Sequence, residues 1–116
     1  MRIDLHCHSE ASHDCSAPLD AILTRSRQQA ISVQAITDHN EIWGAQELAR
    51  MATAPGDPLI IVGEEVTSSE GEIIGLFLQE RIPEGLTPER VVAAIREQGG
   101  LVLLPHGFDP LKAHRL

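Results

Sequence analysis

Short apolar segments recur along the chain and predict five β-strands. The clearest is LIIVGEEVT at 59–67, whose continuous apolar start is typical of a strand that is covered on both faces. SVQAITDH at 32–39 and LVLLPH at 101–106 have comparable apolar centres. Residues 2–6 and GEIIGLFLQE at 71–80 complete the set of predicted strands.

Other segments place apolar residues at helical spacing. The clearest helix is TPERVVAAIREQGG at 87–100, where Thr87 is a suitable N-cap, a proline occupies the first turn and a glycine pair ends the segment. Two further helices are predicted over 17–30 and over 40–52, the second with Asn40 as its N-cap. The order of elements is then β-α-β-α-β-β-α-β. This alternation predicts an α/β fold built on a mostly parallel sheet.

Length and composition fit a single globular domain that spans residues 1–116. The hydrophobic fraction of 42% and the charged fraction of 22% are ordinary for such a domain. The net charge of -8 is unfavourable for a nucleic-acid surface, because phosphate contacts require basic side chains. An acidic chain can still bind an anionic substrate where bound cations reverse the local charge.

The sequence shows none of the patterns that direct a protein into or across a membrane. No apolar run approaches the roughly 20 residues of a spanning helix, so no membrane partner is expected. The N-terminus has no basic region followed by an apolar one, as a signal peptide has. Cys7 and Cys15 are too few for a disulfide framework. A cytoplasmic location is therefore expected.

Residues that commonly bind metals gather where the predicted strands end. At these ends lie His6 and His8, Asp38 and His39, Glu64 and Glu65, and His106. Because sites in parallel sheets and barrels form at the carboxyl ends of strands, these side chains are expected on one rim. In an extended chain, His6 and His8 point to the same side and can converge on one ion, whereas Cys7 points away. The two oxygens of Glu65 could bridge two cations.

Each of these residues also has an ordinary structural explanation. A single His-x-His pair is weak evidence for a metal, and Asp38 could simply cap the following helix. The Gly-Glu-Glu sequence could be a solvated turn, although Glu64 and Glu65 cannot face the same way in a strand. His106 could be a hydrogen-bonded core histidine, and His13 is expected to be a surface loop residue. The joint placement of so many ligand-type residues at strand ends favours the metal site.

Four segments taken together resemble the motifs of the polymerase and histidinol phosphatase (PHP) domain family. They are DLHCHSEASHD at 4–14, ITDHN at 36–40, GEEVT at 63–67 and LPHGFD at 104–109. The resemblance implies a distorted seven-stranded β/α barrel that hydrolyses phosphoesters with up to three divalent metal ions, which would be Zn, Mn or Fe. With about five predicted strands, the chain would be the N-terminal portion of such a barrel.

The resemblance assigns metal-binding roles residue by residue. The residues are His6, His8, Asp14, His39, Glu65, Glu72 and His106. Glu65 rather than Glu64 takes the bridging position, because the family pattern is Gly, any residue, Glu. Asp38 and His39 are the predicted catalytic residues. Asp4 and Asp38 match acids that orient neighbouring histidines in the family.

The sequence departs from the family pattern at two places. Glu72 stands where family members often carry a histidine, although a glutamate can still bind Zn²⁺, Mn²⁺ or Fe²⁺. The late Gly-Ser-Asp-x-His segment of the family, which supplies two ligands, is absent. His114 is not a suitable replacement, because it follows no predicted strand and lacks the preceding acid. We therefore expect an incomplete barrel that depends on self-association or on a missing C-terminal half.

The leading functional hypothesis is a metal-dependent phosphoesterase that hydrolyses a phosphate mono- or diester with a metal-activated hydroxide. Its substrate would be a phosphorylated small molecule or a nucleotide. The alternative is a non-catalytic, metal-binding remnant of the domain. A polymerase-associated exonuclease module is a weaker third hypothesis, because the chain is acidic and contains no polymerase sequence.

Overall fold

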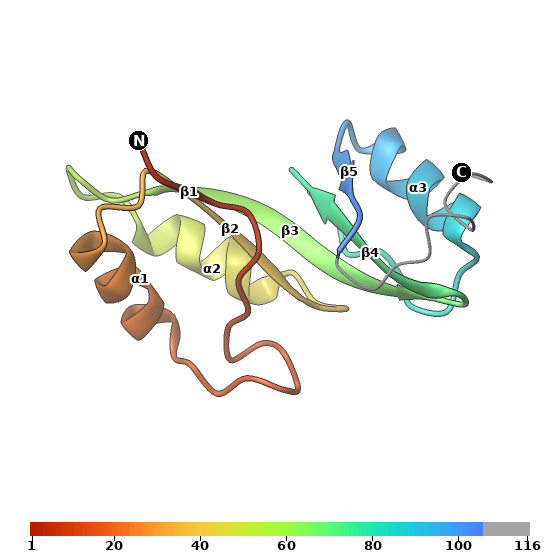
Figure 1. Ribbon diagram of the computed structural model, residues 1–116, viewed down its shortest axis with the longest axis horizontal. Coiled ribbons are helices and arrows are strands. Elements are labelled where there is room, and N and C mark those ends of the chain that lie inside the picture. The colour runs from red at the N-terminus through yellow and green to blue at the C-terminus, as the bar shows by residue number, and fades with distance from the viewer. Residues whose placement is uncertain (106–116) are drawn as a thin grey trace.

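The elements of the fold follow the order that the sequence predicts. The computed structural model describes residues 1–105. The elements are β1 (Ile3–Asp4), α1 (Leu19–Gln28), β2 (Val33–His39), α2 (Trp43–Met51), β3 (Leu59–Ser68), β4 (Gly71–Leu76), α3 (Pro88–Glu97) and β5 (Leu101–Leu103) (Figure 1). The predicted β-α-β-α-β-β-α-β order is confirmed.

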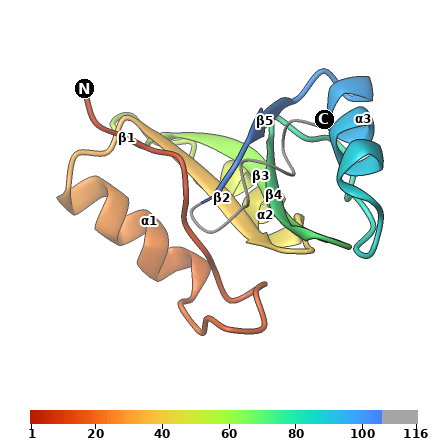
Figure 2. The same ribbon diagram turned by 45° about the vertical axis from the view of Figure 1, so that its right-hand side comes forward.

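The strands form one sheet in the order β1-β2-β3-β4-β5. Parallel pairing joins β1 to β2 and β2 to β3, whereas β3 to β4 and β4 to β5 are antiparallel. The prediction of a mostly parallel sheet is therefore wrong. β3 ends at Ser68 and β4 begins at Gly71, and a connection this short can join only antiparallel neighbours. The sheet curls along its length (Figure 2), and the α/β fold class is confirmed.

The three helices pack on the same face of the sheet. α1 and α2 cover β2 with one apolar cluster, and α3 covers β4 with another. Val62 of β3 contacts both clusters, which places them on one face. The opposite face of the sheet has its own buried cluster, formed by Ala35, Ile61, Ile74 and Leu76. Within the described part of the chain, none of the helices has the length and apolarity of a membrane span.

Two predicted elements are shorter than expected beside the metal-type residues. β1 ends at Asp4 rather than at residue 6, so the segment that carries His6 and His8 leaves the regular strand. Asn40 does not cap α2, which begins at Trp43. Asn40 has a left-handed φ of 57° and donates its backbone N–H to the carbonyl of Glu65.

Candidate metal centre

Strand register places two candidate ligands side by side. His39 is the last residue of β2, and it pairs directly with Glu65 of the parallel strand β3. Residues i and i+2 of a strand share a face, so Glu65 lies on the same side of β3 as Ile61 and Gly63. That side is opposite to the helices. The centre is therefore built on the face of the sheet that no described helix covers.

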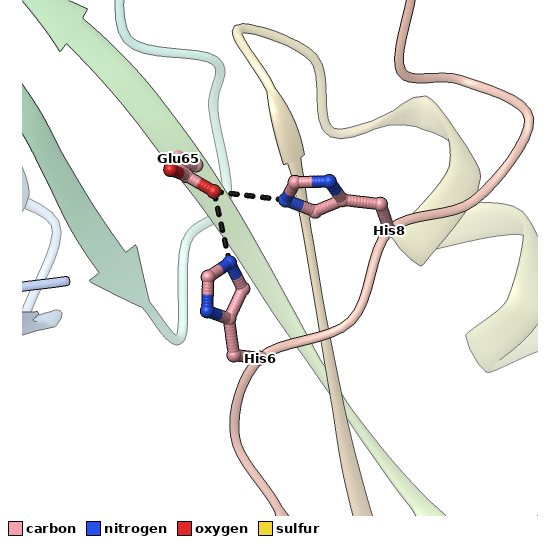
Figure 3. A group of neighbouring side chains, drawn as sticks. All are labelled: His6, His8 and Glu65. Carbon is pink, nitrogen blue, oxygen red and sulfur yellow. Dashed lines mark hydrogen bonds and ion pairs between the residues drawn. The ribbon is translucent and has the colours of Figure 1, made fainter. Parts of the chain in front are cut away.

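Glu65 is the point at which the two N-terminal histidines converge. Its Oε1 lies 2.9 Å from Nε2 of His6 and 2.8 Å from Nε2 of His8 (Figure 3). The carboxylate is buried, whereas the imidazole of His6 is about half exposed. One ligand atom from each residue lies within 4.8 Å of the others, which is close enough to bind a single ion. These three residues form the first candidate ligand group.

A second candidate group shares His8 with the first. Nε2 of His39 lies 3.0 Å from Oδ2 of Asp14, and Nδ1 of His8 lies 3.6 Å from Oδ1 of the same carboxylate. Burial acts to raise the pKa of Asp14, but the charges of His39 and His8 together with hydrogen bonds outweigh it and hold this pKa below its ordinary value. Asp14 is therefore a carboxylate rather than an acid at neutral pH. The group His8, Asp14 and His39 again offers atoms within 4.8 Å of one another.

The third candidate group adds Glu72 of β4. Glu72 pairs across the antiparallel ladder with Thr67, two residues beyond Glu65, so both carboxyl groups occupy one face. Oε2 of Glu72 also lies 3.2 Å from Nδ1 of His39. His39, Glu65 and Glu72 have ligand atoms within 4.8 Å of one another. The β3–β4 hairpin thus brings a second acid to the centre.

The two glutamates share a proton when no cation separates them. Burial and the adjacent Glu65 together raise the pKa of Glu72 to about 7, against the opposing charge of His39. Burial also acts to raise the pKa of Glu65, but hydrogen bonds from Glu72, His8 and His6 outweigh it and hold this pKa at about 2. A protonated Glu72 therefore hydrogen-bonds to an ionised Glu65. Such a pair, one carboxyl group buried and the other partly exposed, is well suited to a divalent cation, which would replace the shared proton.

The three groups are linked rather than separate. Each of His8, His39 and Glu65 belongs to two groups, so ions bound at neighbouring groups would share ligands. The donor set consists of imidazole nitrogens and carboxylate oxygens, which are the ligands of Zn²⁺ and of other divalent transition metals. The described residues therefore fit divalent cations.

Comparison with known proteins identifies the family. The family model of the PHP domain matches residues 4–109. The chain belongs to the PHP domain family. The resemblance seen in the sequence motifs is thereby confirmed, and the match extends over nearly the whole chain.

Similar proteins differ in how much of their length this PHP domain covers. The uncharacterized protein MJ1587 of Methanocaldococcus jannaschii is 40% identical over 96% of the chain, which spans 70% of that protein. A 5'-3' exoribonuclease of Haemophilus influenzae is 30% identical over 97% of the chain, which spans 44% of that protein. A crystal structure from Bacteroides vulgatus, of a two-domain protein containing a predicted PHP-like metal-dependent phosphoesterase, has a TM-score of 0.79 at 20% identity. That match covers 95% of this chain and 36% of the other, and it confirms the fold.

Asp38 lies beside the centre of this PHP domain without facing a histidine ring. Its buried carboxylate accepts hydrogen bonds from the hydroxyl groups of Ser9 and Ser12 and from the backbone N–H of Ser9. Ser12 Oγ in turn accepts the backbone N–H of His39. Asp4 likewise accepts the backbone N–H of His6. The expected acid-to-imidazole contacts are therefore replaced by contacts to backbone and hydroxyl groups, and a catalytic role for Asp38 stays a prediction.

Of the histidines His13 and His106, the structure describes only His13. His13 is exposed, as expected for a loop residue, and its ring centroid lies 5.1 Å from that of His39. It belongs to none of the candidate groups among residues 1–105. His106, the predicted ligand at the end of the fifth strand, lies outside the described residues, as does His114.

Asn40 holds the loop after His39 in place, a structural role that the sequence interpretation missed when it took Asn40 as a helix cap. Its Nδ2 donates to Thr67 Oγ1, and its Oδ1 accepts the backbone N–H of Thr67. Its carbonyl accepts Nε of Arg81 at 2.6 Å. Asn40 therefore fastens the chain that follows His39 to β3, two residues beyond Glu65. An asparagine directly after a strand end is a usable signal, because asparagine tolerates the left-handed conformation better than most residues.

Proposed function

We propose that this PHP domain is a metal-dependent phosphoesterase that hydrolyses a phosphate mono- or diester. The observation that carries the proposal is the set of three candidate groups with shared ligands. Its residues are His6, His8, Asp14, His39, Glu65 and Glu72. A cluster of shared carboxylates and imidazoles is the arrangement that phosphoryl-transfer chemistry uses to handle a charged substrate. The phosphoesterase named in the Bacteroides vulgatus protein supports the same class of reaction.

Divalent cations held by these imidazoles and carboxylates would supply the positive charge that neutralises phosphate oxygens and would lower the pKa of a bound water to about 7. Glu65 is already in the ionised state that cation binding needs. The low pKa of Glu65 leaves it ionised, and its position between His6 and His8 orders both imidazoles. Without this charge reversal, a chain with a net charge of -8 would repel a phosphoester.

Asp38 acts in this proposal as a positioning residue. Through Ser12 it fixes the backbone of His39, and through Ser9 it fixes the loop that starts at His8. His39 contacts Asp14 through one ring nitrogen and Glu72 through the other. Both nitrogens of His39 are thus committed within the centre. In this proposal His39 therefore binds metal and does not transfer a proton. Another group or water protonates the leaving group.

The substrate class in the proposal is a phosphorylated small molecule or a nucleotide. The relative named as an exoribonuclease raises a second candidate, the end of an RNA strand. The acidic composition favours the smaller substrates, because tracking along a polynucleotide requires a basic groove. Assays with para-nitrophenyl phosphate, a nucleoside monophosphate and a short 5'-phosphorylated oligoribonucleotide separate these candidates.

The test of the proposal combines metal analysis with hydrolysis. The purified chain is loaded with Zn²⁺ or Mn²⁺, its metal content is measured, and release of phosphate is followed. Glu65→Gln keeps the size of the side chain but removes the shared anion, so we expect loss of most bound metal and of hydrolysis. Glu89→Gln, an exposed residue in the first turn of α3, is the matched control.

Three outcomes decide the proposal. Metal uptake with hydrolysis that only Glu65→Gln abolishes supports it. Metal uptake without any hydrolysis would favour a non-catalytic metal-binding domain. Failure of the wild-type chain to bind either cation at neutral pH contradicts the proposal altogether.

A further inference from the structure

A cavity of about 540 Å³ opens beside the candidate metal centre on the side of α1. Its wall includes the candidate ligands His6, His8 and Asp14, and it also includes Arg25 of α1 and Gln29. We call it the Arg25 cavity. Both ribbon views show the segment after β1 running alongside α1 (Figures 1 and 2). The volume falls in the range of small-molecule sites, so one bound molecule can contact both the candidate metal-binding residues and α1.

Arg25 is an exposed cation without a carboxylate partner in the part of the chain that the structure describes. Its Nη2 donates to Cys7 Sγ at 3.1 Å, and a thiol sulfur is a weak acceptor. Other arginines are engaged more strongly. Arg27, Arg50 and Arg81 each lie against a carboxylate. The guanidinium of Arg25 therefore retains donors that a ligand can use.

A second guanidinium strengthens the positive charge at this end of the cavity. Arg2 donates from Nη1 to the carbonyl of Gln29 at 3.0 Å. Gln29 lies four residues after Arg25 and so follows it on the same side of the helix. Arg2 therefore lies next to a residue of the cavity wall, whereas Arg25 is itself part of that wall. Because the wall also carries the carboxyl groups of Asp4 and Asp14, the guanidinium of Arg25 is a distinct cationic position in acidic surroundings.

We propose that Arg25 binds a second anionic group of the substrate, so that the preferred phosphoesters also carry a carboxylate or a further phosphate. The inference rests on the proposed function, which places the reacting phosphate at the candidate ligands of the same cavity. The planar fork of a guanidinium matches the paired oxygens of either anion, and such charged bidentate contacts are strong and directional. Arg25 is then a specificity-determining residue.

Equilibrium binding tests this without turnover, because phosphonates resist hydrolysis. The full chain, loaded with Zn²⁺, is titrated by calorimetry with propylphosphonate and with 3-phosphonopropionate, which differ in one carboxylate. Hexylphosphonate and 6-phosphonohexanoate form a longer pair. A 1,6-hexane diphosphonate distinguishes a second phosphate from a carboxylate. We expect the doubly anionic member of at least one pair to bind about tenfold more tightly, as one charged contact provides.

Variants assign that preference to Arg25. Arg25→Gln is expected to remove the preference, and Arg25→Lys to restore part of it. Gln29→Glu keeps Arg25 but places a carboxylate one helical turn away, so it should also reduce the preference, and it serves if Arg25→Gln does not fold. Arg90→Gln is the control, because it makes the same charge change at an exposed position on α3.

Failure of the inference and failure of the proposed function look different. If the wild-type chain binds propylphosphonate and hydrolyses para-nitrophenyl phosphate but shows no preference in either pair, the Arg25 inference alone is wrong. A preference that survives in both Arg25→Gln and Gln29→Glu overturns it equally. If the metal-loaded chain neither binds phosphonates nor hydrolyses any phosphoester, the proposed function fails and the inference falls with it.

Discussion

The carboxyl groups of Glu64 and Glu65, consecutive residues of β3, lie on opposite faces of the sheet. Glu65 contacts the imidazoles of His6 and His8. Glu64 turns toward the helix-covered face, where its Oε1 accepts the backbone N–H of Ile82 at 2.8 Å. Its Oε2 has no hydrogen-bond partner among the described residues, and burial raises the pKa of Glu64 to about 7. Consecutive residues of one strand thus place an ionised candidate metal ligand on one face of the sheet and a buried, protonated acid on the other.

Glu64→Gln is expected to change how stability depends on pH. The pKa of Glu64 is raised in the folded state, so its protonated form stabilises the fold fully below the unfolded pKa of about 4.5, and this contribution is lost as pH rises through about 7. The loss amounts to about 3 kcal/mol, since one pKa unit corresponds to about 1.4 kcal/mol. The measurement is the free energy of urea unfolding at pH 5 and pH 8, in metal-free buffer.

Glutamine keeps the acceptor for Ile82 but cannot ionise. We therefore expect the difference between the wild type and Glu64→Gln to shift in favour of the variant by about 3 kcal/mol from pH 5 to pH 8. Glu89→Gln, at an exposed site, should leave the wild-type pH dependence unchanged. If Glu64→Gln follows the wild type at both pH values, Glu64 is ionised in the fold and the assignment is wrong.

Metal affinity should rise with pH through the titration of Glu72. A carboxyl group with a pKa of about 7 carries its proton below neutrality, and this proton must leave before the oxygen can bind a cation. We expect affinity for Zn²⁺ to increase from pH 6 to pH 8 with release of a proton. Calorimetry in buffers of different ionisation enthalpy counts that proton. Glu72→Gln should bind more weakly and release fewer protons, and an unchanged proton count would exclude Glu72 as a ligand.

Asp14→Ala and His13→Ala should separate a ligand from its neighbour. Asp14 lies between His8 and His39, so its loss removes one candidate group and leaves the groups centred on Glu65. We expect Asp14→Ala to lower the number of tightly bound ions by about one, measured by atomic emission on dialysed protein. His13 belongs to none of the groups within residues 1–105, so His13→Ala should keep the wild-type metal content. Equal losses in the two variants would mean that the loop binds metal in a different way.

Asn40 allows backbone strain to be distinguished from side-chain bonding. Asn40→Gly keeps the left-handed backbone but removes both contacts to Thr67, whereas Asn40→Ala also places a Cβ in an unfavourable conformation. We expect both variants to lose stability, and Asn40→Ala to unfold at a free energy about 1 kcal/mol lower than Asn40→Gly. Urea unfolding measures the difference. An alanine variant as stable as the glycine variant would show that the loop relaxes out of the left-handed conformation.

The sequence was sufficient for elements whose signals are local. The proline in the first turn and the cap at Thr87 predict α3, and Thr87 does accept the backbone N–H of Arg90. The placement of His39 and Glu65 at neighbouring strand ends follows from strand order and register. Glu72 was predicted as a ligand only through the resemblance to the family. Local pattern could not place it near His39, because that contact depends on a hairpin that reverses the chain between Ser68 and Gly71.

Other features lie beyond a reading of local pattern. The sequence predicts a strand up to residue 6, but regular pairing stops at Asp4, and beyond it the segment stays beside β2 through the backbone N–H of Thr37, which donates to the carbonyl of Cys7. From the sequence, Asp38 was expected to orient a neighbouring histidine. Only the fold shows that its carboxylate accepts hydrogen bonds from the hydroxyl groups of Ser9 and Ser12. These contacts join residues more than twenty positions apart, so the spacing of apolar residues along the sequence cannot predict them.

The distance along the chain between the histidines and Glu65 has a consequence for synthesis. His6 and His8 lie 59 and 57 residues before the carboxylate that joins them. At about 5–20 residues per second, a ribosome makes both histidines roughly 3–12 s before it makes Glu65. During that interval neither imidazole has the carboxylate that it contacts in the fold. The segment that carries the two histidines can therefore reach its folded arrangement only after β3 has left the ribosomal exit tunnel.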